Sequence, residues 1–328
     1  MIQRLFCMGE MDMFYPMLLE PYIAELVWGG TRLLDGYGMK TQKKNAAEAW
    51  VLSCHPDGES RIVNGAFAGQ SLAALYAAHP EICGTNGAKH DRFPLLVKFI
   101  DARDDLSIQV HPDDAYCARA GAGEGKTEAW YILDCEPGAH LILGFREELS
   151  QEDFARAIQT DTLMEKLQSV PVKPGDFFFI DAGTLHAICK GVLLAEVQQN
   201  SNTTFRIYDY NRPGMDGKPR GLHVEQALAV TKREVYTQAE NTMGSAAPGK
   251  RPLCDCAYFK INTVDCKNGC ESAAGAQSFV SLLALAGEGE LVCGDTALSI
   301  RKGQSVFLPA DCGAFTVSGE LQLLETTI

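Results

Sequence analysis

Short apolar runs, each ended by a glycine, a proline or an aspartate, recur along most of the chain. Clear examples are FPLLVKFIDA at 93–102, HLILGF at 140–145, DFFFIDAG at 176–183 and GVLLAEVQQ at 191–199. Runs of this length, rich in β-branched and aromatic residues and bounded by turn residues, are typical of strands in antiparallel sheets. The pattern therefore predicts an all-β protein, built as a sandwich or a barrel.

Helical patterns are confined to four short segments, which we expect at about 71–80, 112–120, 150–168 and 223–231. The first opens on a serine N-cap. The second has Pro112 at its first helical position, followed by two aspartates that suit the positive end of the helix dipole. The third begins with a serine and an aspartate at the spacing of a capping box. Helices are thus a minor part of the predicted fold.

A stretch of small and polar residues, AENTMGSAAPGKRP at 239–252, interrupts this pattern and is typical of a linker. Only strand-like runs follow it, among them FVSLLALAG, GELVCGD and AFTVSGELQLLE. We therefore predict an N-terminal domain over 1–238 and a C-terminal β domain over 253–328.

A degenerate repeat relates the two predicted domains. The segment VKPGDFFFIDAGTLHAI, which starts at 172, can be laid without a gap over IRKGQSVFLPADCGAFTV, which starts at 300. The aligned pairs are Gly175 with Gly303, Phe179 with Phe307, Ile180 with Leu308, Ala182 with Ala310 and His186 with Ala314. Two β domains of common design are implied, and only the first keeps a histidine at this point. Chance similarity of two turn–strand–turn segments is the alternative.

Charge and composition narrow the range of partners. The 328 residues carry a formal net charge of −13, which argues against nucleic acid and anionic membrane surfaces. No apolar run approaches the roughly 18 residues of a membrane span, and MIQRLFCMGEMDMF at the N-terminus lacks the apolar core of a signal peptide. We therefore expect a cytoplasmic protein. Its twelve cysteines lack zinc-ribbon spacing and are interpreted as free, reduced thiols.

Polar side chains within apolar strands are the strongest sign of chemistry. In LSIQVHPDD, Gln109 and His111 are two residues apart and so project from the same face of a strand. GKTEAWYILD places Lys126 and Glu128 at the same spacing, and DAGTLHAI puts His186 after a glycine turn. Three more charged residues lie in apolar strands, namely Lys98, Glu196 and Arg206.

An unpaired charge inside an apolar strand is costly, so these residues are expected to share one site. Two imidazoles, one carboxylate and one amide oxygen suit a divalent metal of borderline hardness, zinc above all. Each residue alone has an ordinary explanation, as a surface glutamine, a satisfied core histidine, an ion-paired glutamate or a strand lysine that reaches solvent. The case for a site depends on their joint placement at strand ends.

The segments LSIQVHPDD, GKTEAWYIL, KPGDFFFIDAGTLHAI and TTFRIYDYNRPG together resemble the type I mannose-6-phosphate isomerase family in its short bacterial form. VWGGTRL at 27–33 and AEAWVLSCHPDGES at 47–60 fit the same family. The resemblance covers about 21–230, with a weaker echo beyond the predicted linker. It implies tandem cupin-type β-barrels (jelly rolls), of which the second is degenerate and binds no metal.

The resemblance also implies a site and a reaction. The ligands of one Zn²⁺ per chain would be Gln109, His111, Glu128 and His186. The residues that bind a sugar phosphate would be Lys98, Lys126 and Arg206. The catalytic residues would be Arg206, Glu196 and Lys126. The reaction would interconvert D-mannose 6-phosphate and D-fructose 6-phosphate through a cis-enediol(ate), in a monomer or a weak homodimer.

One position departs from the family pattern. Members usually have an aspartate in the turn before the arginine, where this chain has Asn202. The proton-transferring base is therefore expected elsewhere, and Glu196 is the preferred candidate. Three other interpretations stay open: a non-catalytic metal- or sugar-binding cupin, an iron-dependent cupin dioxygenase and a storage-type bicupin.

Overall fold

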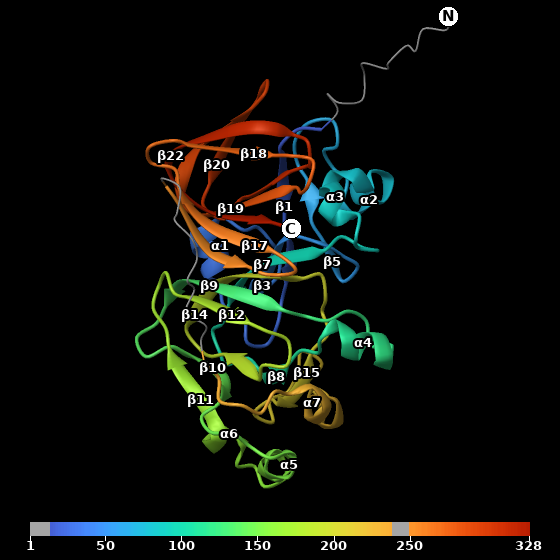
Figure 1. Ribbon diagram of the computed structural model, residues 1–328. Coiled ribbons are helices and arrows are strands. Elements are labelled where there is room, and N and C mark those ends of the chain that lie inside the picture. The colour runs from blue at the N-terminus through green and yellow to red at the C-terminus, as the bar shows by residue number, and fades with distance from the viewer. Residues whose placement is uncertain (1–13, 238–248) are drawn as a thin grey trace, which may run out of the picture.

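The computed structural model describes residues 14–237 and 249–328, and over these residues the fold is mainly β (Figure 1). All paired strands within its sheets are antiparallel. The orange and red C-terminal strands stack above the green and yellow strands, and the helices lie around the outside (Figure 1). The all-β prediction is thus confirmed.

A six-stranded sheet is the central layer of the molecule. Its strands, in spatial order, are β12 (Phe177–Ile180), β9 (Glu128–Cys135), β14 (Val192–Gln199), β7 (Leu95–Asp101), β3 (Glu48–Leu52) and β2 (Tyr22–Ala24). Every residue of β7 and β14 is buried, because both faces of the sheet are covered. Phe99 packs on one face in a core that includes Phe307, and Ile100 packs on the other face in a core that includes Leu141. Burial on both faces explains why these strands read as continuous apolar runs.

A five-stranded sheet faces this layer on the Ile100 side. Its order is β11 (Leu167–Pro171), β10 (His140–Phe145), β13 (His186–Ile188), β8 (Ile108–Val110) and β15 (Phe205–Tyr208). Leu141 and Ile188 from this sheet share a buried core with Trp130 and Ile100 from the six-stranded sheet. The two sheets together form a sandwich, and a small two-stranded ribbon accompanies it, β4 (Cys54–His55) with β5 (Gly58–Glu59).

The C-terminal residues build most of a nine-stranded sheet. Its main order is β16 (Lys250–Asp255), β17 (Lys260–Asp265), β22 (Gly313–Thr327), β19 (Val280–Cys293), β21 (Ser305–Leu308), β1 (Met17–Glu20) and β6 (Arg61–Ile62), with β18 (Cys270–Ala274) on β22 and β20 (Thr296–Arg301) on β19. The segments FVSLLALAG and GELVCGD, expected as separate strands, form the single long strand β19. Strand β1 comes from the opposite end of the chain and pairs Met17 with Phe307.

The helices are short; each of the four predicted segments contains at least one, whereas the helices at 32–37 and 84–87 were not predicted. They are α1 (Arg32–Tyr37), α2 (Leu72–Ala78), the 3₁₀ helix η1 (Pro80–Cys83), α3 (Gly84–Gly87), α4 (Asp114–Ala120), α5 (Gln151–Gln159), α6 (Leu163–Lys166) and α7 (Val224–Val230). Ser71 caps α2, and Ser150 caps α5 by accepting a hydrogen bond from the Asp153 backbone N–H at 3.0 Å. None of the helices within 14–237 and 249–328 is long and apolar enough to cross a membrane.

Two helix predictions need correction. Pro112 is not the first helical residue of α4, because the extended Asp113 is the N-cap and its side chain accepts from the backbone N–H of Tyr116 at 2.6 Å. The helix expected over 150–168 is interrupted between Gln159 and Leu163, and strand β11 already begins at Leu167.

The predicted linker lies mostly outside the described residues. Strand β16 begins at Lys250, so the last three positions of 239–252 belong to a strand, and 239–248 are not described. The division of the chain into domains at this point stays a prediction, and the β1–β21 pairing crosses it. Every cysteine in the described ranges is a free thiol.

The repeat found in the sequence has a structural counterpart. Strands β12 and β21 occupy matching positions of the alignment, and each follows a glycine with a left-handed backbone, Gly175 at φ 89° and Gly303 at φ 90°. Each strand then pairs with a neighbour in the same way: Ile180 opposes Glu128, and Leu308 opposes Val280.

Candidate metal centre and catalytic pocket

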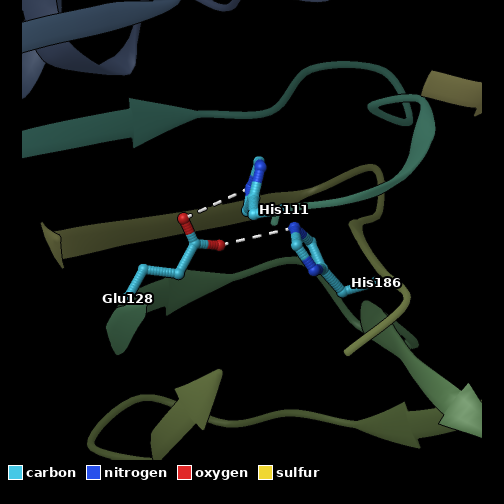
Figure 2. A group of neighbouring side chains, drawn as sticks. All are labelled: His111, Glu128 and His186. Carbon is cyan, nitrogen blue, oxygen red and sulfur yellow. Dashed lines mark ion pairs between the residues drawn. The ribbon is translucent and has the colours of Figure 1, made fainter. Parts of the chain in front are cut away.

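Two imidazoles and a carboxylate meet between the two sheets of the N-terminal sandwich. His111 follows β8 and His186 opens β13, two neighbouring strands of the five-stranded sheet, while Glu128 opens β9 in the facing sheet. Figure 2 shows the Glu128 carboxylate pointing at both rings, with Oε2 3.5 Å from His111 Nε2 and Oε1 3.4 Å from His186 Nε2. One ligand atom from each residue lies within 4.8 Å of the others, and all three side chains are buried.

The hydrogen bonds of the two histidines define their tautomers. His111 Nδ1 lies 2.8 Å from the carbonyl oxygen of Thr203, and His186 Nδ1 lies 2.9 Å from that of Thr184. A carbonyl oxygen only accepts, so each Nδ1 carries the proton and each Nε2 presents its lone pair to Glu128. Such second contacts are the usual way in which metal-binding imidazoles are oriented.

Burial keeps both imidazoles neutral. It lowers the pKa of His111 well below the usual histidine value, and the positive charge of Lys126 acts in the same direction. It also lowers the pKa of His186 to about 4. Neutral imidazoles are the form that binds metal, so no proton has to be displaced at pH 7.

This arrangement fits a divalent cation. Two Nε2 lone pairs face an acceptor carboxylate at distances too long for hydrogen bonds, and His111 Nε2 and Glu128 Oε1 have no hydrogen-bond partner among the described residues. Buried acceptors that face one another are unfavourable unless a cation lies between them. The described part of the chain therefore holds a metal-binding group formed by His111, Glu128 and His186.

Gln109 stands beside this group. It opposes His186 across the β8–β13 pairing, and its Nε2 lies 3.5 Å from His186 Nε2. Its Oε1 accepts a hydrogen bond from Ser107 Oγ at 3.1 Å. A half-turn of the amide exchanges these two atoms without any movement of the backbone, and it would direct Oε1 toward the metal-binding group.

Buried lysines and glutamates continue from the metal-binding group into the core of the site. Lys126 Nζ lies 2.8 Å from Glu128 Oε2 and 3.9 Å from Glu196 Oε1. Lys98 Nζ lies 3.6 Å from the same Glu196 oxygen and 3.3 Å from Glu48 Oε2. Two cations thus hold three carboxylates in a row, which limits the cost of burying them.

The pKa values within this network diverge. Burial raises the pKa of Glu196 above the usual glutamate value, and the negative charge of Glu128 adds to the effect. For Glu48, burial alone would raise the pKa, but Lys98 and a hydrogen bond from Trp50 Nε1 outweigh it, so the pKa is lowered. Glu196 is therefore the carboxyl that takes up a proton more readily, as an acid–base group requires.

A cavity of about 290 Å³ opens beside the network. The predicted residues Lys98, Gln109, Lys126, Glu196 and Arg206 all line it. His111, Glu128 and His186 do not line it themselves, but Gln109 and Lys126, which contact them, do. Five of the eight predicted site residues thus line the cavity, and the other three form the metal-binding group beside it.

Several further residues line the cavity that the sequence analysis did not predict. They include Trp28, Glu48, Trp50, Asp57 and Arg220. Glu48 and Trp50 are two residues apart in β3, the same spacing that marked Lys126 with Glu128, so that signal was available. Arg220 lies in an irregular loop, where no periodic signal exists. Asn202 lines the cavity and donates a hydrogen bond from Nδ2 to Asp57 Oδ2 at 2.9 Å.

Comparisons with known proteins agree with this geometry. Residues 17–133 match the family model described as phosphomannose isomerase type I, catalytic domain, and residues 251–328 match that of the mannose-6-phosphate isomerase cupin domain. A probable mannose-6-phosphate isomerase of Bacillus subtilis, GmuF, is 38% identical over 95% of this chain and 99% of its own length. The chain belongs to the type I mannose-6-phosphate isomerase family.

Structural similarity within the type I mannose-6-phosphate isomerase family is equally extensive. The crystal structure of the mannose 6-phosphate isomerase from Bacillus subtilis superposes with a TM-score of 0.89 at 35% identity, over 95% of this chain and 99% of that one. A mannose-6-phosphate isomerase of Streptococcus mutans is 34% identical over 94% of this chain and 97% of its own length. The alignment with the Escherichia coli family member extends over 391 residues, more than the 328 of this chain, as expected for a short form.

Proposed function

We propose that this chain interconverts D-mannose 6-phosphate and D-fructose 6-phosphate with the help of one Zn²⁺ per chain. The observation that carries the proposal is the buried group of His111, Glu128 and His186 next to a cavity lined by Lys98, Lys126 and Glu196. A non-catalytic sugar- or metal-binding protein has no need of a carboxyl with a raised pKa at this point. Family membership supports the same reaction.

The metal would be held by His111, Glu128 and His186, with the Gln109 amide oxygen as a fourth ligand. Two nitrogens and two oxygens in a buried setting are a ligand set that zinc accepts. When bound, such an ion acts as a Lewis acid that stabilises negative charge developing on a substrate oxygen.

Glu196 is the proposed base. Its Oε2 accepts a hydrogen bond from Trp130 Nε1 at 2.9 Å, which orients the carboxyl, while its Oε1 has no hydrogen-bond partner among the described residues and the side chain lines the cavity. It would take the proton from C2 of the open-chain aldose and return it to C1 on the same face. The transient species is a cis-enediol(ate), because one group serves both carbons.

The neighbouring cations stabilise the charge that this transfer creates. Glu128 and Glu196 outweigh the effect of burial and raise the pKa of Lys126, so its ammonium stays charged at neutral pH. Lys126, with Arg206 at the cavity wall, would stabilise negative charge on substrate oxygens, and Lys98 would add positive potential. A cytoplasmic location and a monomer or weak homodimer stay predictions from the sequence.

The decisive test is an assay of the purified protein with mannose 6-phosphate, in which fructose 6-phosphate is detected by a coupled enzyme. We expect turnover that is lost on treatment with a chelator and restored by zinc, with manganese and cobalt as comparisons. Metal content is measured in parallel. Binding of metal without turnover would leave the non-catalytic cupin as the better interpretation, and turnover that persists after complete metal removal would contradict the metal role.

A further inference from the structure

Two short segments next to the site are hydrogen-bonded to each other. Residues 112–114 follow His111, and residues 125–127 precede Glu128. Because each segment adjoins a member of the metal-binding group, the bonds between the segments help to fix where those two residues stand. The bonds run from the Lys126 backbone N–H to the Pro112 carbonyl at 2.9 Å and from the Gly125 N–H to Asp114 Oδ1 at 3.0 Å.

The close approach of the two segments requires a glycine. A Cβ atom at Gly125 would lie 2.5 Å from the backbone nitrogen of Asp114 and 2.6 Å from its Oδ1, closer than non-bonded atoms can come. A side chain at this position would push the segments apart. Residues 125–127 are therefore in tight contact with the start of α4.

Gln199, the last residue of β14, adds a third connection. Its Oε1 accepts a hydrogen bond from the Thr127 N–H at 2.8 Å, and its Nε2 donates to Asp114, at 3.1 Å to Oδ1 and at 3.3 Å to Oδ2. Gln199 is 9% exposed and Thr127 is 2% exposed, so the bond between them is shielded from water. Thr127 separates Lys126 from Glu128, and the bond therefore holds the backbone between two site residues.

Asp114 determines the orientation of the Gln199 amide. An ionised carboxylate only accepts hydrogen bonds, so the amide nitrogen must face Asp114 and the amide oxygen must face Thr127. A half-turn of the amide would set its oxygen against the carboxylate and its nitrogen against the Thr127 N–H, and both contacts would be repulsive. Asp114 thus acts on the Thr127 backbone through Gln199.

A residue of the C-terminal sheet completes this chain of hydrogen bonds. Tyr258, in the turn between β16 and β17, donates from its hydroxyl to Asp114 Oδ2 at 2.8 Å. Burial raises the pKa of Tyr258, and the hydrogen bond to Asp114 raises it further, so the hydroxyl stays a donor at neutral pH. Asp114 itself is exposed, which makes this outermost bond weaker than the buried bond at Thr127.

We propose that Gln199, oriented by Asp114, is a positioning residue of the site. Neither side chain lines the cavity, so neither touches a substrate bound there. They act through the Thr127 backbone, which sets the places of Lys126 and Glu128 and so the 2.8 Å contact between Lys126 Nζ and Glu128 Oε2. Functional groups of this kind have to be held within about 0.5 Å of their working geometry. This inference depends on the proposed function, because it names what supports two residues of that site.

The test exchanges donor and acceptor between positions 114 and 199 in the full-length, metal-loaded protein. Gln199→Glu keeps the side-chain volume but sets two carboxylates against each other, and about pH 8.5 ensures that both are ionised. We expect kcat to fall by about 10–100-fold and zinc affinity, measured by competition with a chelator, to fall by about 10-fold. KM for mannose 6-phosphate should stay within about threefold of the parent. Hydrogen exchange at the Thr127 amide should become about 10-fold faster.

The double variant Asp114→Asn with Gln199→Glu places a donor opposite an acceptor again. It should return kcat, zinc affinity and Thr127 exchange to within about threefold of the parent. Asp113→Asn with Gln199→Glu is the matched control, because it removes one negative charge from the adjacent residue, whose side chain bonds to the Tyr116 N–H. The control should stay as impaired as Gln199→Glu alone.

Each outcome separates this inference from the proposed function. If the parent protein isomerises mannose 6-phosphate and Gln199→Glu keeps the parent kcat, zinc affinity and exchange rate, the inference is wrong while the function stands. Equal recovery in the Asp113→Asn control would also overturn it, since the effect would then come from net charge alone. If the parent protein shows no isomerisation, zinc affinity and Thr127 exchange still test the inference, and unchanged values contradict it.

Melting curves verify that each variant is folded. Should Gln199→Glu fail to fold, Asp114→Ala takes its place, because position 114 is exposed and tolerates the change. Asp114→Ala should lower kcat and zinc affinity by about 3–10-fold, since the Gln199 amide loses the group that orients it. Parent values of both in Asp114→Ala would contradict the inference.

Discussion

The repeated β unit occurs twice, once around β12 and once, in the C-terminal part of the chain, around β21. The two copies share the same backbone arrangement but differ in the side chains at the positions of the candidate site. In the N-terminal copy, Ile180 lies opposite Glu128, and the next strand opens with His186. In the C-terminal copy, Leu308 lies opposite Val280, and the residue aligned with the histidine is Ala314. The same backbone arrangement thus surrounds the candidate site in the N-terminal copy and a packed apolar core in the C-terminal copy. A few side chains account for the difference.

A buried carboxylate in each copy makes the difference clear. Glu196 keeps one oxygen without a hydrogen bond among the described residues, next to the cavity. Glu325, which is 4% exposed, accepts from Asn262 Nδ2 at 3.1 Å and Ser272 Oγ at 3.3 Å and also pairs with Lys250. The C-terminal carboxylate is therefore satisfied by the protein itself, whereas the N-terminal one is left available for a ligand.

The largest effect, on metal content and turnover, is expected from removal of the Glu128 carboxylate. Glu128→Gln keeps the side-chain volume but removes the charge that faces His111 and His186. We expect metal content to fall close to zero and turnover to fall by about 10³-fold, a barrier increase of about 4 kcal/mol. Elemental analysis and the coupled assay measure both. Glu325→Gln, which removes the buried carboxylate of the C-terminal copy, is the matched control. An equal loss of metal and turnover in Glu325→Gln would mean that the two copies do not differ in the way described.

The second effect concerns the C-terminal copy. Val280→Glu places a carboxylate where the N-terminal copy has Glu128, but here within a buried cluster of apolar side chains that includes Leu308 and Phe315. An unpaired buried charge should lower the free energy of unfolding by about 3–5 kcal/mol, whereas Val280→Leu should cost less than about 1.5 kcal/mol. Urea denaturation separates the two. A Val280→Glu protein as stable as Val280→Leu would mean that this position is open to water.

The third effect is a pH dependence restricted to the N-terminal copy. Burial lowers the pKa of His186 to about 4 in the folded protein, whereas an unfolded histidine titrates near 6.5. The contribution of His186 to the stability of the metal-free protein is therefore complete above about pH 6.5 and declines as the pH falls toward 4, by about 2 kcal/mol at pH 5, and the lowered pKa of His111 acts in the same direction. Residues 253–328 contain no histidine.

Hydrogen exchange of chelator-treated protein at pH 7 and pH 5 measures this dependence. We expect β8 and β13 to lose protection at pH 5 before β19 and β22 do. Equal loss in all four strands would contradict a local origin at His186.

The smallest effect is expected outside the buried network. Asn202→Ala removes one hydrogen bond to the exposed Asp57 at the cavity wall, so kcat should fall by less than about threefold. Steady-state kinetics on mannose 6-phosphate is the measurement. A loss above about 100-fold would place the proton-transferring group at this turn and not at Glu196.

Much of the fold was predictable because its strands are unusually apolar. The segments around Phe99 and Ala195 are buried on both faces, so they read as strands without any alternation. For the same reason the sequence did not predict the order of the layers. A strand that is buried on both faces has no polar face to indicate which neighbouring layer covers which side. The N-terminal strand β1 was missed for a related reason: four residues are too short for a pattern.

The site was predictable where polar residues interrupt regular strands, and not where loops supply the groups. Lys126, Glu128 and His186 stand out against apolar neighbours, so their convergence could be inferred. Arg220 reaches the cavity only through the path of an irregular loop and through its grip on Asp209, eleven residues earlier. Contacts of that kind depend on tertiary structure that no local pattern encodes.

The pairing of β1 with β21 has a consequence for how the protein is made. Met17 leaves the ribosome early, but its partner Phe307 follows about 290 residues later. At about 5–20 residues per second, the first strand waits for tens of seconds before its hydrogen-bonding edge is covered. During that interval β1 can pair only with β6, through Leu19 and Ile62, so its edge toward β21 stays uncovered and is the edge at which a chaperone would be of most use.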